Sequence, residues 1–157
     1  MLERSALTVI LAVCLAASSK GSAGDLEGPG RFCGYSPIID LVAGEQIVTL
    51  KGGIHSGTFE WRGDFGTLNV LGIGWAGKPE GRMRASLTAK GHAFFLPRKE
   101  DGQFVTAIWN KAYGAAYFRS PTRFTKAQVS AIERVDLFDE TKPEPINCKL
   151  RTVFSWE

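Results

Sequence analysis

Short stretches in which apolar and polar residues alternate run along most of this chain, and glycine-rich turns separate them. Such alternation is typical of β-strands that bury one face and expose the other. The pattern predicts strands at residues 38–42, 46–51, 58–61, 67–75, 82–88, 93–96, 104–109 and 113–118. It therefore predicts an all-β fold, either a β-sandwich or a partly closed antiparallel barrel.

One segment departs from this alternation and predicts a short helix near residues 125–133. Thr125 is followed three residues later by Gln128, which is the spacing of a capping box. Val129 and Ile132 then lie on one helical face, and strand character returns at residues 135–138. We expect no longer helix elsewhere in the mature chain.

The first 23 residues are predicted to be a signal peptide. Arg4 supplies a positive charge, and residues 5–17 form an apolar run that is too short to span a bilayer. Small residues at Gly21 and Ala23 then predict cleavage after Ala23. Residues 24–157 would be a single exported domain, periplasmic or extracellular, with no transmembrane segment after the leader is removed. A buried N-terminal helix is the alternative.

Removal of the leader leaves two cysteines, Cys33 and Cys148. An even pair in an exported chain predicts one disulfide, which would tie the first segment of the domain to the last. The alternative is two buried free thiols. Neither cysteine has the C-x-x-C spacing of a redox or zinc site.

Charge and motif content exclude several classes of function. The formal net charge is +3 and the basic residues are scattered, so nucleic acid is not an expected partner. The chain has no phosphate-binding loop, and we expect no cofactor.

The segment at residues 52–57, GGIHSG, has the outline of a nucleophile elbow, but His55 occupies the serine position of the motif. We interpret its glycines as a bulge or bend between two strands. His55 and His92 are the only histidines, and their spacing assigns no metal site. A secreted hydrolase that uses a histidine and a carboxylate remains an alternative, without assigned catalytic residues.

Aromatic residues provide the one positive indication of function. The hairpin predicted over residues 57–75 carries Trp61, Phe65 and Trp75, and we do not expect all three to point into the core. At least one should remain accessible at the rim of a binding surface. The sequence therefore predicts a small secreted or periplasmic binding domain without enzymatic activity, whose ligand is a protein or a saccharide. A structural envelope component is a further alternative.

Overall fold

The computed structural model describes residues 25–52 and 56–138 of the chain. Its strands, in chain order, are β1 Leu26–Glu27, β2 Gly30–Cys33, β3 Pro37–Leu41, β4 Gln46–Gly52, β5 Ser56–Gly63, β6 Gly66–Ile73, β7 Ala93–Glu100, β8 Gln103–Asn110, β9 Gly114–Ser120 and β10 Asp136–Leu137. The helix α1 spans Lys126–Glu133 and lies between β9 and β10 in the chain.

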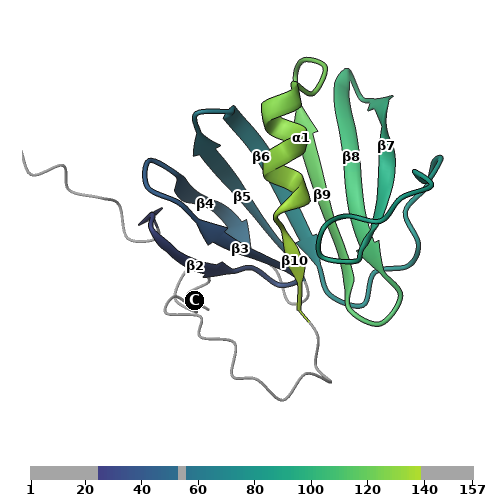
Figure 1. The fold of residues 1–157 in the computed structure, drawn as a ribbon, viewed down its shortest axis with the longest axis horizontal. Coiled ribbons are helices and arrows are strands. Elements are labelled where there is room, and N and C mark those ends of the chain that lie inside the picture. Colours follow the sequence, from purple (N-terminus) through teal and green to yellow (C-terminus); the bar gives the residue numbers. More distant parts are fainter. Residues whose placement is uncertain (1–24, 53–55, 139–157) are drawn as a thin grey trace, which may run out of the picture.

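The strands form two antiparallel sheets (Figure 1). The larger sheet has seven strands in the order β1-β4-β5-β6-β9-β8-β7, and the smaller has three in the order β10-β3-β2. The smaller sheet and α1 lie over one face of the larger sheet (Figure 1). The prediction of an all-β, sandwich-like fold is confirmed, and the sheets are not closed into a barrel.

The core lies between the covered face of the larger sheet and this second layer. Its buried side chains come from both sheets and from α1, and include Phe32, Ile39, Ile47, Phe59, Trp61, Leu68, Val70, Ile108, Phe118, Ile132 and Leu137. At Gly72 the two layers approach so closely that a Cβ there would lie 2.4 Å from Cδ of Pro37. Gly72 therefore permits the close contact between β6 and the start of β3.

The helix forms as the capping-box spacing predicts. The Thr125 hydroxyl accepts a hydrogen bond from the Gln128 backbone N–H at 3.1 Å, and Gln128 Oε1 accepts one from the Thr125 N–H at 3.0 Å. Gln128, Ala131 and Ile132 are buried against the larger sheet. Within the described residues α1 is the only α-helix, as expected.

The two predicted hairpins are also present. Strands β5 and β6 pair from Ser56 and Ile73 to Gly63 and Gly66, with Asp64 and Phe65 at the tip. Strands β8 and β9 pair from Phe104 and Ser120 to Asn110 and Gly114. The register of β4 against β5 shifts between Thr49 and Lys51, so the sheet is irregular beside the glycine-rich segment. This shift precedes the glycine-rich segment, in which Gly52 and Gly57 pair with each other. Residues 53–55 lie outside the described part of the chain, so the bulge or bend in that segment stays a prediction.

Two details of the strand prediction are wrong. Strand β7 continues through Pro97 to Glu100, because a shift in register between Phe95 and Arg98 accommodates the missing proline N–H. The predicted strand at residues 82–88 is reduced to one bridge between Met83 and Phe95. The sequence pattern also missed the short strands β1 and β2.

Several predictions fall outside the described residues. They include the signal peptide and Cys148, so the disulfide from Cys33 at the end of β2 stays a prediction. Among the residues that the structure describes, no helix has the length and apolar character needed to cross a membrane.

Candidate binding surface

The face of the larger sheet that points away from α1 is the outer face, and it divides into two parts. Alternate residues of each strand lie on it, since neighbouring residues of a strand point to opposite faces. On β7 and β8 these include Phe95, Val105 and Ala107, whose side chains are completely buried. Something must therefore cover the outer face of β7 and β8.

The cover is the connection between β6 and β7, residues 74–92. Trp109 Nε1 of β8 donates a hydrogen bond to the carbonyl of Ala76 at 3.0 Å. Arg98 Nη1 of β7 donates to the carbonyl of Glu80 at 2.9 Å, and Pro79 between these two points is buried. The first part of the connection is thus held over β8 and β7. A connection of this length without regular structure is uncommon in a compact domain unless it serves a function.

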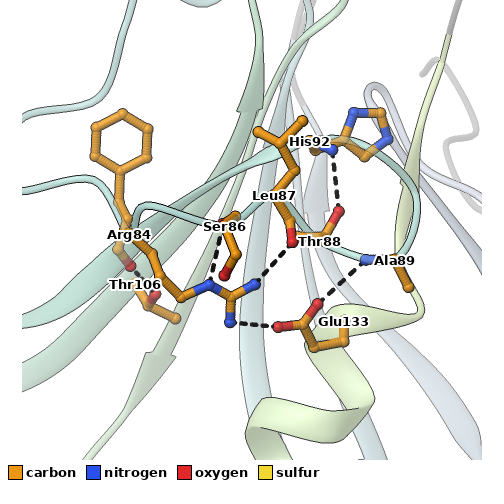
Figure 2. Close-up of polar contacts among 9 residues, drawn as sticks. Arg84, Ser86, Leu87, Thr88, Ala89, His92, Thr106 and Glu133 are labelled. Carbon is orange, nitrogen blue, oxygen red and sulfur yellow. Dashed lines mark hydrogen bonds and ion pairs between the residues drawn. The ribbon is translucent and has the colours of Figure 1, made fainter.

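The second part of this connection is anchored on the covered face of the larger sheet, near the C-terminal end of α1 (Figure 2). The Arg84 guanidinium donates to the carbonyls of Ser86 and Leu87, both at 3.1 Å, and to Glu133 Oε1 at 2.5 Å. Its centre also lies 4.6 Å from the centroid of the Phe94 ring. Arg84 therefore curls the backbone after Met83, which explains why the alternating pattern at residues 82–88 does not form a strand.

The outer face of β5, β6 and β9 carries three rows of side chains that the register aligns across the strands. The rows are Ser56, Ile73 and Ala115; Thr58, Leu71 and Tyr117; and Glu60, Asn69 and Arg119. All of these side chains except Ala115 are partly exposed. We call this surface, together with Trp75 at the end of β6, the open face.

On and beside the open face, three guanidinium groups share two carboxylates in ion pairs, which leaves a net charge of +1. Glu60 accepts a hydrogen bond from Arg62, two residues along β5. Glu100 accepts a hydrogen bond from Arg98 at 2.6 Å on one carboxylate oxygen and a hydrogen bond from Arg119 at 3.1 Å on the other. The open face therefore combines many hydrogen-bonding groups with little net charge.

Tyr117 lies in the middle row of the open face, on β9. Partial burial is the main cause that raises the pKa of its hydroxyl above the ordinary value, against the opposing effect of Arg98. The phenol therefore stays protonated at neutral pH and keeps both a donor and an acceptor.

Trp75 is the most exposed large apolar side chain of the described residues, at 67%. Its φ of 51° places a bulky residue in the left-handed region, which glycine normally occupies. Gly114, with a φ of 104°, allows this geometry, because a Cβ there would lie 2.3 Å from the Ile73 carbonyl oxygen and 2.9 Å from the Trp75 nitrogen. The hydrogen bond from Trp109 to Ala76 holds the following residue. The contact with Gly114 and the hydrogen bond from Trp109 to Ala76 together fix the backbone at the exposed Trp75.

The three aromatic residues predicted for the site occupy different environments. Trp61 is completely buried, with the Phe65 ring centroid 4.8 Å away and the Arg134 guanidinium 5.5 Å from its ring. Phe65 is partly buried against the core cluster. Only Trp75 is substantially accessible, so the expectation of at least one exposed member is met, and the structure does not bring the three together. The open-face rows were missed, because they depend on the pairing of β6 with β9, which the alternation within each strand does not reveal.

A histidine and a carboxylate do approach each other, as the hydrolase alternative requires, but the histidine is buried and only the Asp136 side chain is partly exposed, at 30%. His92 Nε2 lies 2.7 Å from Asp136 Oδ1, and the His92 side chain is 3% exposed. The Thr88 hydroxyl accepts a hydrogen bond from the His92 backbone N–H (Figure 2), and Nδ1 is buried with no hydrogen-bond partner among the described residues. His55, the other candidate, lies outside the described part of the chain.

The described residues contain no group of three or more His, Cys, Asp or Glu side chains that could hold a metal ion. Comparison of the chain with protein-family models, with curated proteins and with solved structures found no match.

Proposed function

We propose that this protein is an exported binding domain without enzymatic activity, and that the open face with Trp75 is its binding surface. The observation that carries the proposal is the exposed Trp75 in a left-handed backbone conformation. The signal-peptide pattern of residues 1–23 and the predicted disulfide support export.

The left-handed backbone conformation of Trp75 has an energetic cost. A non-glycine residue in a sparsely populated backbone region costs on the order of 1–3 kcal/mol. A side chain that is 67% exposed recovers little of this cost through burial in its own domain. Tryptophan is also enriched among the residues that dominate binding energy at interfaces. Binding to a partner explains why a tryptophan is held at this position.

Cosedimentation with insoluble envelope material from the producing cells tests the proposal. The mature wild-type chain should bind saturably, and Trp75→Ala should weaken binding about tenfold or more. Val42→Ala is the matched control, since Val42 is also exposed, at 51%, but lies in the turn between β3 and β4. Equal binding by wild type and Trp75→Ala would overturn the proposal.

The hydrolase alternative has one observation in its favour, the contact between His92 and Asp136. A general base must reach the proton that it abstracts from a substrate or nucleophile. The buried Nδ1 and the 3% exposure of His92 therefore favour a structural role for this pair. A structural envelope component would have no need of a strained and exposed tryptophan, so the binding function is the better supported.

A further inference from the structure

We infer that the open face binds a neutral oligosaccharide chain, an inference that rests on the binding function proposed above and names the class of its ligand. A sugar ring presents an apolar C–H surface and a rim of hydroxyls that both donate and accept hydrogen bonds. A matching protein surface needs apolar or aromatic side chains beside a row of polar groups.

The polar row consists of Glu60, Asn69 and Arg119, which are aligned across β5, β6 and β9. The carboxylate accepts hydrogen bonds, the amide both donates and accepts, and the guanidinium donates. Neighbouring strands lie about 4.8 Å apart, so these groups follow one another over roughly 10 Å. Successive hydroxyls of one ligand can therefore meet a donor or an acceptor on each strand.

The apolar part of the surface lies directly beside this row. Leu71 and Tyr117 are neighbours on β6 and β9, and Ile73 follows two residues after Leu71 on the same face. Trp75 continues the chain beyond the end of β6. The half-buried Leu71, Ile73 and Tyr117 suit the C–H surface of a sugar, and the Tyr117 hydroxyl adds another hydrogen-bonding group.

Charge decides between a neutral and an ionic saccharide. The carboxylate of Glu60 is paired with Arg62, and Arg119 shares the carboxylate of Glu100 with Arg98. A polyanion would have to compete with Glu60 and Glu100 for these guanidinium groups. A neutral ligand can instead use the remaining hydrogen-bonding capacity of the groups without separating the ion pairs.

The same residues favour a saccharide over a protein partner. The buried centre of a protein interface is depleted of charged side chains and is more apolar than its rim. Here Glu60 and Arg119 lie within the surface, and its apolar side chains other than Trp75 are half-buried between polar rows. Such a surface would bury little apolar area against a protein, but it offers many hydrogen-bonding groups to a saccharide.

Isothermal titration calorimetry with defined sugars tests the inference. The mature chain is titrated with cellohexaose, maltohexaose and hexa-N-acetylchitohexaose as neutral probes, and with oligogalacturonate as an anionic probe. We expect saturable binding of at least one neutral hexasaccharide and none of oligogalacturonate. Asn69→Ala and Trp75→Ala should each weaken that binding about tenfold, while Val42→Ala leaves it unchanged. Thermal melts establish that the variants fold, and Glu60→Gln serves as a second polar-row variant if Asn69→Ala does not.

Binding of none of the three neutral sugars, binding of oligogalacturonate alone, or neutral binding that survives both Asn69→Ala and Trp75→Ala would overturn the inference. The envelope experiment separates this result from failure of the proposed function. If no neutral sugar binds but Trp75-dependent envelope binding persists, only the ligand class is wrong. If protease treatment of the envelope material abolishes that binding, the partner is a protein and the saccharide inference fails.

Discussion

The backbone of Gly114 lies against the carbonyl oxygen of Ile73 so closely that a Cβ at position 114 would stand 2.3 Å from it. Together with the φ of 104° at Gly114, this contact lets the chain turn out of β6 and place Trp75 in its exposed position. The start of one strand therefore determines the geometry at the end of its neighbour.

Replacement of Gly114 by alanine tests this relationship. Gly114→Ala should lower the free energy of unfolding by about 2 kcal/mol or more, since it adds both a steric clash and an unfavourable φ. Guanidinium denaturation measures the change. Gly77→Ala is the control, because a Cβ at Gly77 meets nothing within 4 Å and its stability should change by less than about 0.5 kcal/mol. Equal stability of the two variants would contradict the contact.

Replacement by alanine should affect the stability of the fold much more at Trp61 than at Trp75. Trp61 is completely buried, so Trp61→Ala should cost about 3–5 kcal/mol through lost burial and a cavity. Trp75 is 67% exposed, so Trp75→Ala should change stability by less than about 0.5 kcal/mol. Urea denaturation of both variants measures the difference. A large loss of stability in Trp75→Ala would mean that its main role lies within the domain.

The pattern of the sequence predicted the strands and the helix wherever local signals agreed with tertiary packing. Thr125 and Gln128 cap α1 as their spacing indicates, because a capping box involves only residues close in the chain. At Arg84 the prediction failed, because its partner Glu133 is distant in sequence and the alternation of residues 82–88 gives no sign of it. The continuation of β7 past Pro97 likewise depends on its pairing with β8.

The candidate site was predictable only in part, for a similar reason. Hairpin geometry indicated that Trp61, Phe65 and Trp75 would not share one environment. Which of them is exposed depends on the second layer, which covers Trp61, and on Gly114, which lies far from Trp75 in the sequence. The rows of the open face arise from the pairing of β6 with β9, a contact that the alternation within a single strand does not reveal.

The connection between β6 and β7 should depend on the planar guanidinium of Arg84. Arg84→Lys keeps the charge but cannot reach Glu133 and the carbonyls of Ser86 and Leu87 together, so residues 84–92 should open more often. We expect faster proteolysis after the exposed Lys90, with a loss of about 1–2 kcal/mol in stability. Lys126→Arg at the start of α1 is the control. Unchanged cleavage in Arg84→Lys would show that other contacts anchor this segment.

The cross-strand pair of Arg31 and Asp40 predicts a pH-dependent contribution to stability. The Arg31 guanidinium donates to both carboxylate oxygens, at 2.6 and 2.9 Å, and this hydrogen bonding is the main cause that lowers the pKa of Asp40. A depressed pKa in the folded state stabilises the protein above the unfolded pKa of about 3.9, and this stability is lost as the pH falls through the folded pKa.

Asp40→Asn should therefore reduce stability at neutral pH, and its difference from wild type should shrink below about pH 4. Both side chains are exposed, at 41% and 57%, so solvent screening limits the effect to less than about 1 kcal/mol. Urea midpoints of wild type and variant across this pH range measure it. Asp64→Asn at the hairpin tip is the control, and a difference that grows on acidification would contradict the sign.

The contact between His92 and Asp136 joins the end of the β6–β7 connection to strand β10. His92 Nε2 lies 2.7 Å from Asp136 Oδ1, and the Leu137 N–H, which donates to this oxygen at 2.8 Å, also lies 3.2 Å from Nε2. Asp136→Ala removes the carboxylate that contacts both the imidazole and the Leu137 N–H, and should cost about 1–3 kcal/mol because His92 is buried. Asp136→Asn retains a carbonyl oxygen and should cost less.

Chemical denaturation measures both variants, and Asp101→Asn in the β7–β8 turn is the control. If both Asp136→Ala and Asp136→Asn are as stable as the wild type, the contact between His92 and Asp136 does not stabilise the fold.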